Sequence, residues 1–226
     1  MHIKGFLFDL DGTLANTLPL CIKIYQQTFQ HFTGRRYSDD EVTAHFGLTE
    51  GGICQRVIPE HWQQALAYYH QAYEQAHDEC AEPFAGIIEV LQLLRSKGVR
   101  MAVVTGKGEH TANFTLKRLG IAEYFEYVAA GKEDAVIKAT AMRQILRAWK
   151  MDPQEAAYIG DAASDVEQSA EAGVLPLAAE WAETATIHLL KDIHPYANFT
   201  SVEDFMTWIT LNIETITTDQ NNKRKG

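Results

Sequence analysis

The chain has 226 residues, 46% of them hydrophobic, and a formal net charge of -10 at pH 7. This length and composition allow a buried core, in one domain with an insertion or in two small domains, whereas the acidic balance argues against a broad surface for nucleic acid. The sequence has no uninterrupted apolar stretch of about 18 residues, as a membrane span would require, and Lys4, Asp9 and Asp11 interrupt the segment that a signal peptide would need to be apolar. We therefore expect a cytoplasmic protein without a nucleic-acid or membrane partner.

The first predicted element is a buried strand that ends in two acidic residues, in the sequence FLFDLDGTLANT. Side chains alternate between the two faces of a strand. If the extended geometry persists through Leu10, Asp9 and Asp11 point the same way at short range, and two like charges so placed need a cation or a shared proton. The Asp-Gly pair also allows a hairpin turn, but LANTLP does not continue as an alternating strand.

A block of helices is predicted next, over residues 16–82, with little strand signal. ANTLPLCIKIYQQTFQHF has the apolar periodicity of an amphipathic helix. A second helix begins with the capping box of Ser38 and Glu41 and ends at Gly47. A third covers PEHWQQALAYYHQAYEQAHDEC, with Pro59 near its first turn. So long a helical block between two strands predicts an inserted domain.

From Phe84 onward, helices and strands are predicted to alternate. The helices are GIIEVLQLLRSKG, EHTANFTLKRLG, DAVIKATAMRQILRAWK and SDVEQSAEAG, the strands are RMAVVT, YFEYVAAG, AAYIGD and VLPLA, and HPYANFTSVEDFMTWITLNI adds a last short strand and a closing helix. This alternation indicates right-handed crossovers and a parallel sheet with helices on both faces. The predicted fold is α/β, a three-layer Rossmann-like core of residues 1–15 and 83–216 with a helical cap domain of residues 16–82, and the tail 217–226 is predicted to be disordered.

Several conspicuous residues are not expected to carry chemistry. The cysteines Cys21, Cys54 and Cys80 are odd in number and lack metal-ligand spacing, so we expect buried thiols rather than disulfides or a zinc site. Surface or packing positions are also expected for the histidines of the helical block, His31, His45, His61, His70 and His77.

Polar residues follow three of the predicted strands. They are Asp9 and Asp11, then Thr105 and Gly106 in VVTGK, then Asp161 and Asp165 in YIGDAASD. Active sites of parallel sheets lie beyond the carboxyl ends of the strands, so if these strands are neighbours, four carboxylates, one hydroxyl and several backbone N–H groups converge. Oxygen ligands of this kind suit Mg²⁺, with a phosphate oxygen as a further ligand.

The same grouping predicts a phosphate site. The hydroxyl of Thr105 and the N–H of Gly106, at the opening of a helix, would bind phosphate oxygens. A lysine is still needed to balance the charge, and Lys138 is our choice, with Lys132 and Lys107 as alternatives. VVTGK alone could also be a strand followed by a glycine-containing loop.

DLDGT, VVTGK, a lysine near a helix start and GDAASD, in that order, resemble the four motifs of the haloacid dehalogenase-like (HAD) hydrolase superfamily. The match runs from Ile3 to about Val174, and the helical insertion resembles the group that includes phosphoglycolate phosphatases, β-phosphoglucomutases and small pyrophosphatases. One departure is Ala139 after Lys138, where many relatives have proline. The resemblance implies a magnesium-dependent phosphatase that acts on a small phosphorylated metabolite, such as a phosphoglycolate-like phosphomonoester, through an aspartyl-phosphate. A sugar phosphomutase, or a non-catalytic regulator that binds magnesium and phosphate, is the alternative.

The resemblance also implies roles for individual residues. Asp9 would be the nucleophile, and Asp11 would be the general acid and then the general base. Thr105, the amide of Gly106 and Lys138 would hold the phosphoryl oxygens. Lys138 could instead be an ordinary solvated lysine.

The implied magnesium ligands are Asp9, the backbone carbonyl of Asp11 and Asp161. Asp165 would be a further ligand or would support the others. Its alternative role is to cap the helix VEQSAEAG, and the two roles are compatible.

The substrate would be selected by the cap, and the sequence leaves its identity open. Arg35, Arg36, Glu50 and the Gly51-Gly52 pair are the candidate contacts there. A paired arginine could grip a carboxylate or a second phosphate, or could lie in a solvated loop. Hinged closure of the cap is expected to bring Glu50 over the site. The expected partner is a small phosphorylated metabolite, and the chain would be a monomer or a homodimer.

Overall fold

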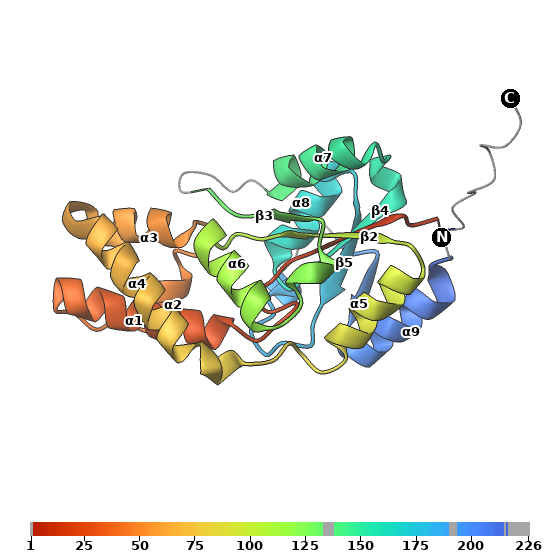
Figure 1. Cartoon of the computed structure of the whole chain (residues 1–226). Helices are drawn as coiled ribbons and strands as arrows, with labels where there is room; N and C mark the ends of the chain where they lie inside the picture. The colour runs from red at the N-terminus through yellow and green to blue at the C-terminus, as the bar shows by residue number, and fades with distance from the viewer. Residues whose placement is uncertain (1, 133–137, 190–193, 215, 217–226) are drawn as a thin grey trace, which may run out of the picture.

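The computed structural model describes residues 2–132, 138–189, 194–214 and 216. Six parallel strands form one sheet in the order β3-β2-β1-β4-β5-β6 (Figure 1). Their bounds are β1 Gly5–Phe8, β2 Arg100–Val104, β3 Tyr127–Ala129, β4 Ala156–Gly160, β5 Leu175–Ala179 and β6 Ala197–Phe199. Phe8, the last residue of β1, pairs with Val103 and Ile159. The three strands that precede polar motifs are therefore adjacent and end together, which meets the condition on which the predicted convergence depends.

Helices cover both faces of the sheet, because apolar side chains point to both sides of β1. Phe6 and Phe8 face one core, which includes Phe205 and residues of α5, whereas Leu7 faces a second core with Met142 of α7. The helices after the cap are α5 Ile87–Ser96, α6 Glu109–Arg118, α7 Lys138–Trp149, α8 Ala163–Ala172 and α9 Val202–Asn212. Figure 1 shows α7 and α8 on one side of the sheet and α5 and α9 on the other. The α/β three-layer prediction is confirmed.

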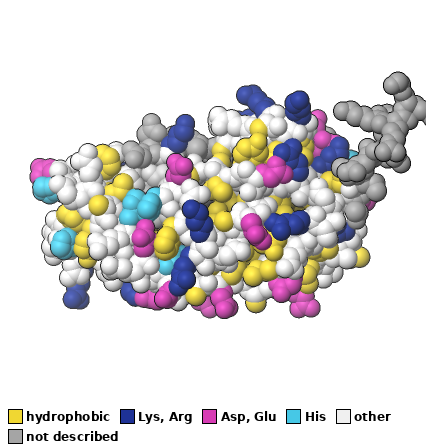
Figure 2. Space-filling model, in the orientation of Figure 1, with side chains coloured by type: hydrophobic (Ala, Val, Ile, Leu, Met, Phe, Trp, Pro, Cys, Tyr) yellow, Lys and Arg dark blue, Asp and Glu magenta, His cyan; other side chains and the backbone are white. Residues whose placement is uncertain are grey.

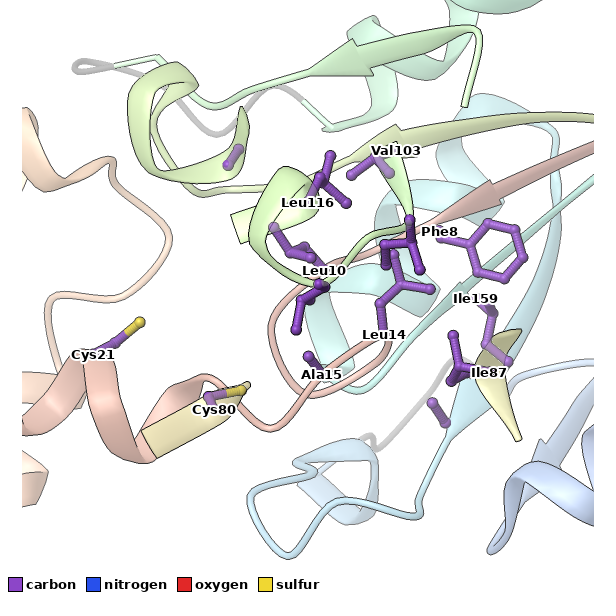
Figure 3. Close-up of a cluster of buried hydrophobic side chains, with 14 of the residues drawn as sticks. Phe8, Leu10, Leu14, Ala15, Cys21, Cys80, Ile87, Val103, Leu116 and Ile159 are labelled. Atoms are coloured by element: carbon purple, nitrogen blue, oxygen red, sulfur yellow. The ribbon is translucent and has the colours of Figure 1, made fainter. Parts of the chain in front are cut away.

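The cap helices lie together beside the sheet, at the left of Figure 1. They are α1 Leu18–Thr33, α2 Asp39–Thr43, α3 Glu50–Val57 and α4 Trp62–Ala76. α1 and α3 both pack against α4, and the rings of Tyr25 and Tyr69 approach to 4.4 Å between centroids. The apolar cluster of Figure 3 continues from Phe8 and Ile159 of the sheet to Cys21 and Cys80 at the base of the cap.

The cap differs from the prediction in three places. The capping box of Ser38 and Glu41 is present, but α2 ends at Thr43 with Ala44 as its C-cap, so the predicted end at Gly47 is wrong. α3 was not predicted, since two glycines in its first turn lower its helix propensity. The long third helix is divided into a 3₁₀ turn at Pro59–His61, α4, and a second 3₁₀ turn at His77–Cys80.

Other predictions fall partly outside the described residues. The start of the predicted helix DAVIKATAMRQILRAWK and the predicted disordered tail 217–226 lie outside them. All three cysteines are free and buried, as expected. Within the described ranges, no helix combines the length and the apolar character needed to cross a lipid bilayer.

The histidines of the cap take surface and packing positions, as predicted. Figure 2 shows histidine side chains on the surface of the cap end. His31 stacks on Tyr68 at 4.7 Å between ring centroids. His77 is fully buried, with its Nε2 atom 3.3 Å from the hydroxyl of Thr115.

Candidate active site

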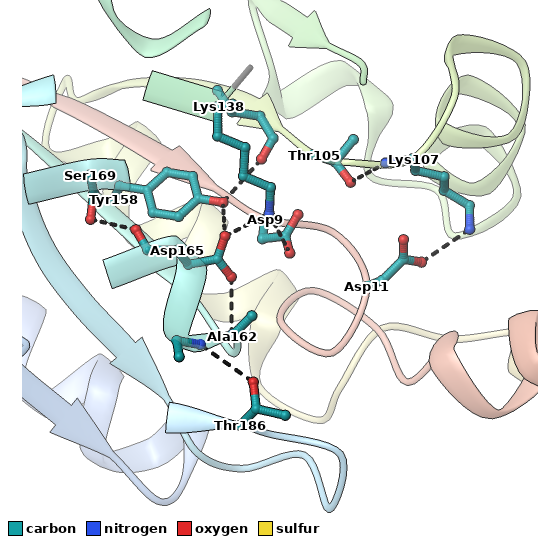
Figure 4. Close-up of polar contacts among 12 residues, drawn as sticks. Asp9, Asp11, Thr105, Lys107, Lys138, Tyr158, Ala162, Asp165, Ser169 and Thr186 are labelled. Carbon is teal, nitrogen blue, oxygen red and sulfur yellow. Dashed lines mark hydrogen bonds and ion pairs between the residues drawn. The ribbon is translucent and has the colours of Figure 1, made fainter. Parts of the chain in front are cut away.

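The loop after β1 sends its two aspartates to different partners. β1 ends at Phe8, and Gly12 has a positive φ of 78°, so the extended geometry does not continue through Asp11. In Figure 4, Asp9 points toward Lys138 while Asp11 points toward Lys107. The condition of an extended chain through Leu10 is therefore not met, although both carboxylates line the same cavity.

The close carboxylate neighbours of Asp9 come instead from the region after β4. Asp9, Asp161 and Asp165 are buried, and one ligand atom of each lies within 4.8 Å of the others. Two glycines permit this approach. A Cβ atom on Gly12 would lie 2.2 Å from Oδ2 of Asp161, and one on Gly160 would lie 2.3 Å from Oδ2 of Asp165.

Lys138, the first residue of α7, reaches into this cluster. Its Nζ lies 3.0 Å from Oδ2 of Asp9 and 2.6 Å from Oδ1 of Asp165, and its side chain is largely buried. The alternative of a solvated lysine is therefore wrong. Of the other two candidates, Lys107 pairs with Asp11, and Lys132 is exposed beside a separate cavity.

Both carboxylate oxygens of Asp165 already have partners. Oδ1 accepts hydrogen bonds from Lys138 and lies 3.0 Å from the hydroxyl of Tyr158, while Oδ2 accepts from the N–H of Ala162 just before α8. Asp165 thus holds both the start of its own helix and Lys138. Sequence reasoning missed Tyr158, although it is the one side chain with a polar end in the strand Ala156–Gly160.

The charges of the cluster are not balanced by Lys138 alone. Burial raises the pKa of Asp9 to about 7; Lys138 opposes this shift, and the charges of Asp165 and Asp11 add to it. Burial, with Asp9 and Asp165 nearby, also raises the pKa of Asp161 well above its usual range. Oδ1 of Asp9 is buried and has no hydrogen-bond partner among the described residues. Three buried carboxylates with one open oxygen fit a divalent cation that prefers oxygen ligands.

Asp11 belongs to a second polar group at the base of the cap. It accepts a hydrogen bond from the hydroxyl of Thr17, and its Oδ1 lies 3.1 Å from Nζ of Lys107. Lys107 also lies 3.2 Å from Sγ of Cys21 on α1. Burial alone would lower the pKa of Lys107, but Asp11 and its other neighbours raise it well above its usual range. Sequence reasoning named Lys107 only as an alternative phosphate lysine.

Thr105 and Gly106 line the same cavity as Asp9 and Lys138. The Thr105 hydroxyl accepts a hydrogen bond from the N–H of Lys107. α6 begins only at Glu109, with Gly108 as its N-cap. The predicted placement of Gly106 at the opening of the helix is therefore wrong by two residues, because the chain makes a further turn after the strand.

The first turn of α6 is occupied by Glu50 of the cap. Its carboxylate accepts a hydrogen bond from the N–H of Gly108, at 2.7 Å, and another from the hydroxyl of Thr111. A carboxylate is favourable at this position because the first N–H groups of a helix lack partners inside the helix. Glu50 therefore joins α3 of the cap to α6 of the core. Gly51, beside it, lines the second cavity.

The two arginines of the cap, Arg35 and Arg36, are not among the described residues that line the cavity. Arg35 forms an ion pair with Glu41, and its guanidinium lies 4.4 Å from the centroid of the Tyr37 ring. The cavity between cap and core has a volume of about 380 Å³.

Comparisons with known proteins show what the chain is similar to. The profile of the family described as haloacid dehalogenase-like hydrolase matches residues 6–179. Pyrophosphatase PpaX from Halalkalibacterium halodurans is 30% identical over 176 residues, which are 77% of this chain and 82% of that protein. A predicted phosphoglycolate phosphatase from Haemophilus somnus has a similar structure, with a TM-score of 0.74 at 20% identity over 92% of this chain and 98% of that chain. The structure of CbbY from Rhodobacter sphaeroides in complex with phosphate has a TM-score of 0.77 at 20% identity, and the match covers 90% of this chain and 96% of that chain. These two structural likenesses show the fold alone.

The raised pKa of Asp9 has a consequence for stability. Between pH 3.8, the pKa of an ordinary aspartate, and about 7, folded Asp9 keeps a proton that the unfolded chain has released. The free energy of unfolding of the metal-free protein should therefore fall as the pH rises through this range. In Asp9→Asn, we expect the decrease in the free energy of unfolding over this pH range to be smaller by on the order of 1–4 kcal/mol. The measurement is urea unfolding in the presence of a metal chelator. The same substitution at exposed Asp40 is the control, and parallel pH profiles for wild type and Asp9→Asn would contradict the expectation.

The contact of Glu50 with α6 should hold the cap against the core. In Glu50→Gln, the side chain loses its charge and half of its acceptor capacity, so the first turn of α6 should open more often. We expect amide hydrogen exchange at residues 108–112 to be on the order of tenfold faster. Glu60→Gln, on an exposed 3₁₀ turn of the cap, is the matched control. Equal exchange in the two variants would show that Glu50 does not restrain this turn.

Proposed function

The chain belongs to the haloacid dehalogenase-like hydrolase family, and from this premise we propose that it is a magnesium-dependent phosphatase of small phosphorylated metabolites that works through an aspartyl-phosphate on Asp9. One observation carries the proposal. Asp9 has one oxygen held by Lys138 and the other buried without a partner, at the edge of a cavity that can admit a substrate. A carboxylate so placed has an oxygen available to bind phosphorus or a cation.

In the first proposed step, a carboxylate oxygen of Asp9 bonds to phosphorus and the bond from phosphorus to the leaving oxygen breaks. Asp11, which must carry a proton once the substrate is bound, gives that proton to the leaving oxygen, so an alcohol departs. In the second step, Asp11 takes a proton from water while the water oxygen bonds to phosphorus and Asp9 is released. The balance is a phosphomonoester and water giving an alcohol and inorganic phosphate.

The surrounding residues would divide the remaining tasks. Thr105, the amide of Gly106 and Lys138 would hold the phosphoryl oxygens and spread their charge. Lys107 and Thr17 would hold Asp11 at the side of the cavity nearest α1. This position separates the proposed acid from the proposed nucleophile.

Asp9, Asp161 and the backbone carbonyl of Asp11 are the residues that we propose for holding Mg²⁺. Asp165 would act through Lys138, since its oxygens are already engaged. Bound there, the ion would offset the charge of the carboxylates and of the transferring phosphoryl group. Pyrophosphate and phosphoglycolate, named in the similar proteins, are the first substrates to compare.

The proposal is tested by phosphate release from 4-nitrophenyl phosphate. We expect turnover with Mg²⁺, none with a metal chelator, and a loss of at least about 1,000-fold in Asp9→Asn, because an amide is a poor nucleophile. Asp40→Asn, the same change at an exposed cap position, should retain wild-type activity. Activity of Asp9→Asn within about tenfold of wild type would remove Asp9 from the nucleophile role. Isomerisation of a sugar phosphate without net phosphate release would favour a phosphomutase.

A further inference from the structure

The cavity between cap and core has two chemically different halves. The core half carries the polar groups described above. The half formed by the cap is lined mainly by apolar and aromatic side chains, namely Leu18, Ile22 and Tyr25 of α1, Phe46 and Leu48 before α3, and Tyr69 of α4. If the phosphoryl group lies beside Asp9, the leaving group must lie against this apolar half.

No cation in the described lining is free to bind a second anionic group. Of these residues, only Lys107 and Lys138 are basic. Lys138 is shared by Asp9 and Asp165, and Lys107 is paired with Asp11. An anionic leaving group would therefore compete with existing ion pairs.

The carboxylate of Glu50 makes the cavity still less suited to an anionic leaving group. Glu50 also lines the cavity, so four carboxylates and two ammonium groups are present among the described lining residues. Arg35, the candidate for gripping a carboxylate or a second phosphate, pairs with Glu41 outside the lining. Desolvating a carboxylate or phosphate here without a new cation is unfavourable.

One polar atom marks the apolar half. The hydroxyl of Tyr69 is fully buried, and it has no oxygen or nitrogen partner among the described residues. Its contact with the Cys21 thiol, which lowers the pKa of that thiol, is a weak one because sulfur is a weak hydrogen-bonding group, so a substrate atom that bonds the hydroxyl would be favoured. The volume of about 380 Å³ is near the lower limit for small-molecule sites, ~300–1,000 Å³.

We propose, building on the phosphatase function proposed above, that the substrate is a small phosphomonoester with an uncharged, largely apolar leaving group. An arylalkyl or short alkyl alcohol fits this description, with one polar atom at most to meet Tyr69. Phosphoglycolate, pyrophosphate and polyhydroxylated sugar phosphates are then poor substrates, because each places charge or several hydroxyls against apolar side chains.

The main comparison uses three substrates whose leaving groups are primary alcohols, so that differences among these three report binding of the leaving group rather than its acidity. Benzyl phosphate, glycerol 1-phosphate and phosphoglycolate are compared on the full chain with Mg²⁺, with pyrophosphate as a fourth substrate. We expect kcat/KM for benzyl phosphate to exceed each of the others by at least about tenfold. A higher kcat/KM for phosphoglycolate or pyrophosphate would overturn the inference, and would indicate that Lys107 leaves Asp11 to bind the second anion.

A positive charge introduced into the apolar half of the cavity also tests the proposed preference for an uncharged leaving group. Leu48→Lys should lower kcat/KM for benzyl phosphate and raise it for phosphoglycolate, so the ratio of the two should fall at least about tenfold. Leu211→Lys, the same change at a position 79% exposed on α9, should leave this ratio unchanged. An unchanged ratio in a folded Leu48→Lys protein would contradict the inference.

The two proposals fail in different ways. Turnover of polar substrates in preference to benzyl phosphate leaves the phosphatase function standing and removes only the inference on the leaving group. If neither these four compounds nor 4-nitrophenyl phosphate is hydrolysed, the phosphatase proposal fails. Whenever the four compounds give no turnover, calorimetric binding of benzylphosphonate and phosphonoacetate decides the inference. Tighter binding of benzylphosphonate supports it, and tighter or equal binding of phosphonoacetate overturns it.

Discussion

Repulsion among the buried carboxylates of Asp9, Asp161 and Asp165 is the constraint on which the site depends. The parallel register brings the ends of β1 and β4 together, and Gly12 and Gly160 leave room for carboxylates where any larger residue would clash. Lys138 offsets part of the charge, but burial still raises the pKa of Asp9 and of Asp161. The cost of this arrangement is relieved by a proton or by a cation, and the cation is the form that suits phosphoryl transfer.

The two buried lysines separate the site into two regions. Lys138 serves the carboxylate cluster, whereas Lys107 binds Asp11 and contacts Cys21 of the cap. In the proposed mechanism, Asp11 would exchange protons with the leaving alcohol, and it lies on the cap side, where that alcohol would lie. Glu50 joins the same side of the cap to α6, so cap position and the surroundings of Asp11 are physically linked. Under the proposed leaving-group preference, the apolar lining of the cap would then select the leaving group.

The sheet and the order of its strands and helices were accessible to sequence reasoning because apolar runs and their spacing report burial directly. The convergence of Asp9 and Asp161 followed from the rule that parallel strands present their carboxyl ends at one edge, whereas Lys138 was chosen because the carboxylates and the phosphate need a balancing charge. The direction of Asp11 was not accessible, since it depends on where β1 ends and on the turn at Gly12. α3 was missed because its glycines oppose a helix that Thr49 caps and tertiary packing stabilises. The contacts of Glu50 with Gly108 and Thr111 join residues about 60 positions apart, and no local pattern encodes them.

The central claim, that the carboxylate cluster exchanges a proton for Mg²⁺, is tested most directly by calorimetry of Mg²⁺ binding at about pH 7. Titrations in two buffers that differ in ionisation enthalpy give the number of protons released for each ion bound. With the pKa of Asp9 at about 7 in the metal-free protein, we expect release of at least about half a proton. A binding enthalpy that is the same in both buffers would mean that no proton leaves, and it would contradict the account.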